Sequence, residues 1–160
     1  MTLAYVGMGA NLGDPRTQLD TAWQAFQRMP QTKAIARSSL YRSAPVGYED
    51  QPDFLNCVAK LDTALPAPAL LAELQEIERR LGRTRSFLNA PRTIDLDLLL
   101  YGAQTLDDPA VTLPHPRMHE RAFVLAPLVE LEPAIEIPGR GTAAELLRAC
   151  GDQRVQRIAA

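Results

Sequence analysis

Residues 94–101 constrain the fold most, because they combine the strongest strand pattern of the chain with two acidic residues. The segment reads IDLDLLLY, and its apolar residues favour a buried β-strand, whereas Asp is among the residues that strands disfavour. Side chains along a strand point alternately to the two faces of a sheet. The alternation predicts two sets of residues: Ile94, Leu96, Leu98 and Leu100 against a hydrophobic layer, and Asp95, Asp97, Leu99 and Tyr101 on the opposite face.

The remaining periodic segments place this strand last in a β-α-β-β-α-β order. Strand patterns cover residues 3–8, 33–41 and 54–61. One helix is expected to begin at Pro15 with Asp14 as its N-cap, and a second to follow Pro66 and end at Gly82. The order is typical of an α+β, ferredoxin-like fold with a mostly antiparallel sheet and helices on one face. Extra C-terminal helices are predicted near 121–131 and 142–150, and a last strand at 155–158.

Length and composition predict a single domain spanning residues 1–160. The net charge of −2 argues against a general binder of nucleic acid or of anionic membranes. No segment has the apolar length of a membrane span, and the N-terminus lacks the basic region of a signal peptide, so we predict a cytoplasmic protein. Cys57 and Cys150 lack metal-ligand spacing and are interpreted as two small buried thiols, with a disulfide left open.

The acidic pair, Asp95 and Asp97, is a candidate metal site. Their Cα atoms should lie about 6.5–7 Å apart on one face of the strand. Side chains at that spacing can converge on one cation, or on two cations about 3.5–4 Å apart. Magnesium suits such a site, because it binds a few carboxylates and keeps its other positions for water and phosphates. The alternative is a solvated polar face, since a D-x-D motif alone is short and common.

An arginine-rich segment leads into the acidic strand. Residues 79–92 contain five arginines, Arg79, Arg80, Arg83, Arg85 and Arg92, and no acidic residue. Divalent cations on carboxylates, with arginines on an adjoining loop, are typical of phosphoryl-type transfer. The loops at 43–53 and 82–92 are expected to close over substrates. Neither a GxxxxGK[ST] loop nor a GxGxxG after a strand is present, which excludes a P-loop enzyme and a dinucleotide-binding fold.

The two histidines, His115 and His119, are four residues apart, a spacing that would permit a zinc pair on a helix. Pro114 and Pro116 flank His115 and disfavour a helix there. We therefore interpret His115 as a loop residue that binds phosphate or nucleotide, and His119 as a surface residue.

Several motifs, in this order and spacing, are specific enough to indicate a family. They are GANLGD, SxxYRSAPVGYEDQPDFLN, GRTR, APRTIDLDLLLYG and TLPHPRMHERAFVLAPL. Over about residues 3–137 the chain resembles the 6-hydroxymethyl-7,8-dihydropterin pyrophosphokinases of folate biosynthesis. The resemblance implies transfer of the β,γ-pyrophosphoryl group of ATP to the pterin hydroxymethyl oxygen, with release of AMP.

The resemblance also implies the roles of particular residues. Two Mg²⁺ ions would bind Asp95 and Asp97, and the catalytic set would be Arg83, Arg92, Asp95 and Asp97. ATP would contact Gln75, Arg83, Arg85, Arg92, Leu98, Thr112, His115 and Arg121. The pterin would contact Ser43, Ala44, Val46, Phe54, Asn56, Asp95 and Phe123. Phe54 and Phe123 can sandwich the flat ring, and Asn56 can read its hydrogen-bonding edge.

Three parts of the sequence depart from the family pattern. Residues 88–90 read Leu-Asn-Ala where the family has a basic residue followed by Trp-Gly, so the aromatic lid is missing, with Phe87 as a substitute. Pro116 replaces the Tyr that follows the nucleotide-binding His, and Ala10 replaces Ser in GSN. None of these positions belongs to the acidic pair.

The sequence therefore predicts an in-line displacement at the β-phosphorus by a monomer, with ATP and the pterin as its partners and neither nucleic acid nor membrane. Asp97 is the candidate base. One alternative is a two-metal nucleotidyl transferase, which would release pyrophosphate rather than AMP. The other is an RNA-binding module, although the aromatic-rich strand that such sheets use for stacking is absent.

Overall fold

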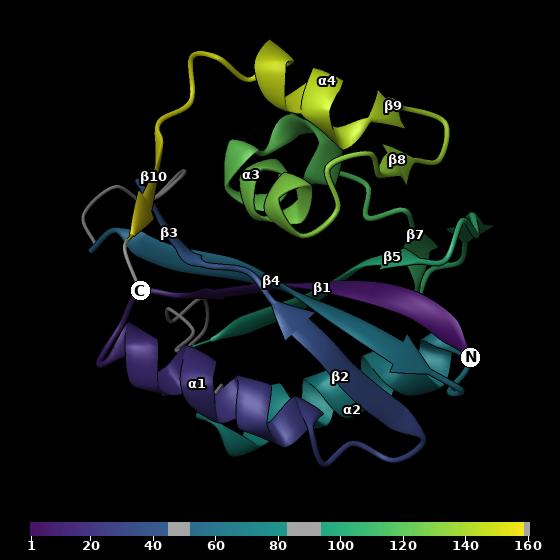
Figure 1. Ribbon diagram of the computed structural model, residues 1–160. Helices are drawn as coiled ribbons and strands as arrows, with labels where there is room; N and C mark the ends of the chain where they lie inside the picture. The colour runs from purple at the N-terminus through teal and green to yellow at the C-terminus, as the bar shows by residue number, and fades with distance from the viewer. Residues whose placement is uncertain (45–51, 83–93, 159–160) are drawn as a thin grey trace.

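The computed structural model describes residues 1–44, 52–82 and 94–158 (Figure 1). Within these ranges six strands form the main sheet, in the order β10-β3-β4-β1-β5, with β2 also paired to β4. The strands are β1 (Thr2–Ala10), β2 (Thr32–Arg37), β3 (Leu40–Ser43), β4 (Phe54–Thr63), β5 (Asp95–Tyr101) and β10 (Val155–Ile158). Each of the pairings is antiparallel. The predicted ferredoxin-like fold is confirmed.

Helices cover both faces of this sheet (Figure 1). The predicted pair, α1 (Pro15–Phe26) and α2 (Ala67–Arg80), packs on one face. The C-terminal helices α3 (Ala122–Leu131) and α4 (Ala143–Ala149) lie over the opposite face. The smaller elements are the 3-10 helix η1 (Met118–Glu120) and two short hairpins, β6–β7 (Leu106–Asp107 and Thr112–Leu113) and β8–β9 (Glu136–Ile137 and Gly141–Thr142). The face predicted to look away from helices is therefore partly covered.

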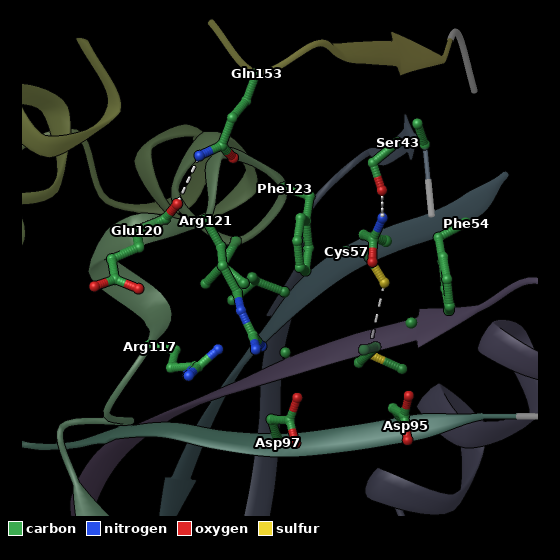
Figure 2. Close-up of a pocket in the computed structure, with 17 residues that line it drawn as sticks. Ser43, Phe54, Cys57, Asp95, Asp97, Arg117, Glu120, Arg121, Phe123 and Gln153 are labelled. Atoms are coloured by element: carbon green, nitrogen blue, oxygen red, sulfur yellow. Dashed lines mark hydrogen bonds between the residues drawn. The ribbon is translucent and has the colours of Figure 1, made fainter. Parts of the chain in front are cut away.

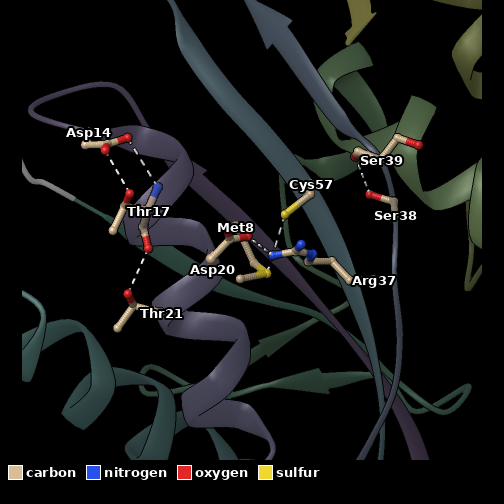
Figure 3. Close-up of polar contacts among 9 residues, drawn as sticks. All are labelled: Met8, Asp14, Thr17, Asp20, Thr21, Arg37, Ser38, Ser39 and Cys57. Carbon is tan, nitrogen blue, oxygen red and sulfur yellow. Dashed lines mark hydrogen bonds and ion pairs between the residues drawn. The ribbon is translucent and has the colours of Figure 1, made fainter. Parts of the chain in front are cut away.

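The helix boundaries follow the predicted capping residues. Asp14 is the N-cap of α1 and accepts hydrogen bonds from the Thr17 backbone N–H at 3.3 Å and from its hydroxyl at 2.7 Å (Figure 3). Pro15 occupies the first helical turn, where its missing N–H costs nothing. Gly82 follows α2 with a φ of 101°, a left-handed conformation that favours glycine.

A β-bulge in β5 changes the predicted faces at its C-terminal end. Val6 of β1 pairs with Leu98, whereas the preceding Tyr5 pairs with Leu100, so Leu99 is an extra residue on β5. Leu99 and Leu100 both lie on the α3 side, and Tyr101 returns to the α1/α2 side. The prediction was therefore wrong for Leu100 and Tyr101, because strict alternation does not hold across a bulge.

The predicted strand at 33–41 is divided into β2 and β3 by two serines. The Ser38 N–H donates to the Val58 carbonyl at 2.9 Å, and its hydroxyl accepts from the Val58 N–H at 2.9 Å. The Ser39 N–H instead donates to the Glu130 carboxylate of α3 at 2.9 Å. The two serines between β2 and β3 thus help to anchor α3 to the sheet.

None of the described helices has the length and apolar character needed to cross a membrane.

Candidate active site

A cavity of about 470 Å³ lies between the sheet and the start of α3 (Figure 2). Strands β1, β3, β4 and β5 contribute residues to its lining, as do η1, α3 and the segment that precedes β10. The cavity joins an acidic side, an aromatic side and a basic side. The acidic side comes from β5, whereas the aromatic and basic sides both include residues at the start of α3.

The acidic side consists of Asp95 and Asp97 on β5, which both line the cavity. The Asp97 carboxylate points from the strand toward the arginines, and Asp95 lies farther along the strand on the side of Phe54 (Figure 2). Between them, the Leu96 N–H donates to the Glu78 carboxylate of α2 at 2.8 Å. Because β5 is at the edge of the described sheet, Glu78 serves this N–H in place of a neighbouring strand. Glu78 is only 4% exposed, so α2 fixes the peptide that separates the two aspartates.

The aromatic side consists of Phe54 and Phe123, which stand on opposite sides of the cavity (Figure 2). Near Phe54, the buried Asn56 amide donates to the Ser43 hydroxyl at 2.8 Å. A Cβ added to Gly9 would lie 3.0 Å from Asn56 Oδ1, tighter than ordinary van der Waals contact. The missing side chain of Gly9 therefore leaves room for the Asn56 amide. Two rings beside a fixed amide suit a flat ligand with a hydrogen-bonding edge.

The basic side consists of Arg117 and Arg121, whose guanidinium groups lie near Asp97 (Figure 2). The Arg121 guanidinium carbon lies 5.7 Å from the centroid of the Phe123 ring, within cation–π distance. Arginines facing two carboxylates across a cavity can bind an anion that also carries a bridging cation.

His115 lies beside this cavity in a loop, as predicted. His115 and Thr112 line a second, neighbouring cavity with a volume of about 450 Å³. Burial lowers the pKa of His115, and the nearby Arg121 lowers it further against the opposite effect of Asp97. The imidazole is therefore neutral near pH 7, and its Nδ1 accepts from the Arg117 N–H at 3.1 Å. His119 lies on η1, where it is half-buried rather than a plain surface residue.

The structure brings together most, though not all, of the predicted residues that it describes. Eight line the cavity: Ser43, Ala44, Phe54, Asn56, Asp95, Asp97, Arg121 and Phe123. Gln75 is exposed on α2, across the sheet, and the Leu98 side chain packs in the core beneath β5. The predicted residues Val46, Arg83, Arg85 and Arg92, like the lid positions 87–90, lie outside the described ranges.

Several lining residues were not predicted, among them Gly9, Cys57, Arg117, Glu120 and Gln153. The GxG of β1 was a usable signal for Gly9, because a strand glycine indicates a close approach. Nothing in the sequence around Gln153 signals its role.

Cys57 is not a nucleophile, because burial raises the pKa of its thiol to about 12. Both cysteines are buried free thiols, as interpreted.

The donor set fits magnesium. Within the described part of the chain, no group of three or more His, Cys, Asp or Glu residues could hold a metal ion. Two carboxylates alone do not make a closed protein cage. They suit a hard cation that takes its other ligands from water and substrate phosphates, which is how Mg²⁺ usually binds.

Comparison with known proteins gives the family. The family described as 7,8-dihydro-6-hydroxymethylpterin-pyrophosphokinase matches residues 5–133. The chain belongs to this pyrophosphokinase family. It is 47% identical over 154 residues to 2-amino-4-hydroxy-6-hydroxymethyldihydropteridine pyrophosphokinase of Pseudomonas aeruginosa, covering 96% of this chain and 95% of that protein. The Haemophilus influenzae protein of the same name is 39% identical over 158 residues, covering 99% of both chains.

Solved structures support the fold. A crystal structure of Plasmodium falciparum HPPK-DHPS superposes with a TM-score of 0.74 at 14% identity. The match covers 92% of this chain, which spans 45% of that longer one. Membership of the family makes this chain a pterin pyrophosphokinase, a transferase of folate biosynthesis, and confirms the resemblance inferred from the sequence motifs.

Proposed function

We propose that the chain transfers the β,γ-pyrophosphoryl group of ATP to the hydroxymethyl oxygen of 6-hydroxymethyl-7,8-dihydropterin. A bond forms between that oxygen and the β-phosphorus, the bond from the β-phosphorus to the oxygen bridging it to the α-phosphorus breaks, and AMP leaves. The hydroxyl proton is lost to a base or to solvent. The observation that carries the proposal is one cavity that holds an aromatic pair, a fixed amide and two carboxylates.

The aromatic side of the cavity is the proposed pterin pocket. The ring would lie between Phe54 and Phe123, and its amide edge would bind the Asn56 side chain that Ser43 orients. Ala44 lines the same end of the cavity. Val46 keeps its predicted role in this pocket. This placement would direct the hydroxymethyl group toward Asp95 and Asp97.

The acidic side is the proposed metal site. Asp95 and Asp97 would hold two Mg²⁺ ions, with Asp95 also at the edge of the pterin pocket. When bound there, the ions would neutralise phosphate charge and lower the pKa of the substrate hydroxyl. Asp97 is the more exposed of the two residues and remains the candidate base.

The basic side is the proposed site of the transferring phosphates. Arg121 lines the cavity and would bind a phosphate in bidentate fashion. Arg83 and Arg92 keep their predicted catalytic roles, and Arg85 its predicted contact with ATP. The neutral His115 would bind the nucleotide together with Thr112. Gln75 and Leu98 keep their predicted contacts with ATP.

The assembly and location predicted from the sequence complete the proposal. We infer a single domain that acts as a cytoplasmic monomer on small molecules, without nucleic acid or membrane partners. Light scattering on the purified protein at enzyme-assay concentrations tests the monomer directly. A dimer at those concentrations would contradict it.

Product analysis tests the proposed reaction. The protein is incubated with ATP, Mg²⁺ and 6-hydroxymethyl-7,8-dihydropterin, and the adenine products are separated. AMP and a pterin diphosphate in equal amounts are expected. Release of pyrophosphate would indicate a nucleotidyl transferase, and release of ADP a simple kinase. Tight RNA binding without Mg²⁺, with no turnover of the pterin, would favour the RNA-binding alternative.

A further inference from the structure

Gln153, in the segment between α4 and β10, makes two hydrogen bonds to the start of α3. Its side-chain Nε2 donates to the Glu120 carbonyl at 2.7 Å, and its Oε1 accepts from the Ala122 N–H at 2.9 Å. Figure 2 shows the amide reaching down to this corner from above. The two bonds bracket Arg121, so the peptide groups before and after that residue are both held by one side chain.

This arrangement supplies a helix cap that the local sequence lacks. The first N–H groups of a helix have no partner within the helix. Arg121 occupies the N-cap of α3, in an extended conformation, but its side chain makes no capping hydrogen bond. Gln153, 31 residues along the chain from Ala122, provides that bond instead. The cap therefore depends on where the C-terminal segment lies.

The C-terminal segment is itself fixed on both sides of Gln153. The Gln153 N–H donates to the Cys150 carbonyl at 2.9 Å, which ties it to the end of α4. Two residues later β10 begins, and Val155 pairs with Ser43 of β3, a residue of the cavity. The Gln153 amide is thus held between α4 and the sheet before it contacts α3.

The capped corner carries two residues of the cavity. Arg121 lies between the two bonds, and Phe123 follows Ala122 directly; both side chains line the cavity, as does Gln153. The guanidinium of Arg121 also packs on the Phe123 ring. We propose that Gln153 is a positioning residue, which sets the directions of Arg121 and Phe123 and so couples the C-terminal segment to substrate binding. This inference rests on the proposed function, in which Arg121 binds phosphate and Phe123 stacks on the pterin.

Two substitutions separate the bonds, and a third is the matched control. Gln153→Met keeps the length of the side chain and removes both bonds. Gln153→Glu keeps an acceptor for the Ala122 N–H but has no donor for the Glu120 carbonyl. Gln156→Met makes the same chemical change on β10, where the side chain is exposed and does not line the cavity.

The first measurement is hydrogen exchange at the Ala122 amide, followed by NMR in the substrate-free protein. Gln153→Met should speed this exchange about 3- to 10-fold, the effect of losing one capping hydrogen bond, while Gln153→Glu should change it less. Gln156→Met should leave it at the wild-type rate. Unchanged exchange in Gln153→Met would overturn the cap.

The second measurement is steady-state kinetics. Gln153→Met should raise the KM for the pterin and for ATP by about 3- to 10-fold each, because misplacing Arg121 and Phe123 weakens the binding of both substrates. If Gln153 had a purely structural role, Gln153→Met would lower the melting temperature, or would lower the apparent kcat by reducing the fraction of active protein. Both KM values would then stay unchanged, and that result would overturn the proposal. A wild-type protein that releases no AMP would refute the proposed function, whereas the Ala122 exchange would still decide the cap.

Discussion

The two faces of the sheet are built in different ways. The face under α1 and α2 is a continuous apolar core, in which Leu19, Phe26 and Leu74 are fully buried. The opposite face is divided. One part packs against α3 through residues such as Leu99 and Leu125, and the other part lines the cavity, which holds both charged and aromatic side chains.

The difference extends to how the covering helices are attached. Helices α1 and α2 pack on the sheet mainly through apolar side chains, although Asp20 of α1 pairs with Arg37 of β2 and Glu78 of α2 accepts from the Leu96 N–H of β5. Helix α3 adds polar contacts: the Glu130 carboxylate accepts from the Ser39 N–H and the Tyr41 hydroxyl, and Glu132 pairs with Lys60 of β4. Directional bonds fix the rotation and height of a helix more closely than apolar packing alone. We therefore expect the α1/α2 face to contribute mainly to stability, and the α3 face mainly to the geometry of the site.

Asp97→Asn should produce the largest effect and should act on function alone. It removes a carboxylate of the proposed metal site from the exposed face of β5, where no apolar packing is lost. We expect kcat to fall on the order of 10³-fold, about 4 kcal/mol of transition-state stabilisation. Rates of AMP release measure it, with Asp62→Asn on β4 of the same sheet, outside the cavity, as control. Near-normal turnover by Asp97→Asn would exclude the proposed mechanism.

Leu74→Ala should produce the opposite result on the other face. The side chain is fully buried between α2 and the sheet, and its removal leaves a cavity. The free energy of unfolding should fall by about 3 kcal/mol, measured by urea denaturation. The KM values of the folded protein should stay within about twofold of wild type, because the core lies across the sheet from the site.

Leu125→Ala on α3 completes that comparison. This side chain is also fully buried, but its helix carries Phe123. A similar loss of stability should therefore be accompanied by a higher KM for the pterin. Equal KM values for Leu74→Ala and Leu125→Ala would show that the two faces do not divide stability and site geometry in this way.

The sequence predicted the α1/α2 face well because that face is periodic. Apolar residues recur at helical spacing in 15–26 and 67–80 and alternate over the first half of β5, so each segment reveals its own buried side. The prediction failed where the register changes. The bulge at Leu99 has no distinctive residue type, since three leucines in succession fit either face.

The cavity was predictable only in part, because its residues come from distant segments. The spacing of Asp95 and Asp97 gave the acidic side from local sequence, and the family resemblance added Asn56 and Phe123. The contacts of Glu78 with Leu96, and of Gln153 with the start of α3, join residues 18 and 31 positions apart. Such contacts depend on the packing of whole elements and leave no periodic signal in the sequence.

Gly9→Ala should sharpen the distinction within the cavity itself. The new Cβ would lie 3.0 Å from Asn56 Oδ1, so the amide, which Ser43 holds through its Nδ2, must shift by a few tenths of an ångström. We expect the KM for the pterin to rise about 10-fold, or about 1–2 kcal/mol, as in other overpacked sites. Gly7→Ala is the matched control, because its Cβ would meet the Leu99 methyl groups at an ordinary 3.4 Å. Equal pterin KM values for the two variants would argue against a fixed role of Asn56.

Glu130→Gln should give the smallest effect and tests the polar attachment of α3. Burial raises the pKa of Glu130, but hydrogen bonds from Tyr41 and Ser39 outweigh it, so the pKa is lowered overall. A carboxyl group whose pKa is lower in the folded than in the unfolded state stabilises the fold at pH values above its unfolded-state pKa. This stabilisation is lost as the pH falls through its folded-state pKa. Wild-type protein should therefore lose unfolding free energy below about pH 4.5, and Glu130→Gln should lose less over the same range.

At pH 7 the Glu130→Gln variant should be less stable by about 1 kcal/mol, since one acceptor oxygen remains for Tyr41 or Ser39. Denaturant unfolding at a series of pH values measures both effects. Glu136→Gln, an exposed change on β8, is the control for the loss of a negative charge. Glu130→Gln and wild type could instead lose the same unfolding free energy as the pH falls. In that case the Glu130 carboxylate does not attach α3 to the sheet, and apolar packing attaches the helices on both faces.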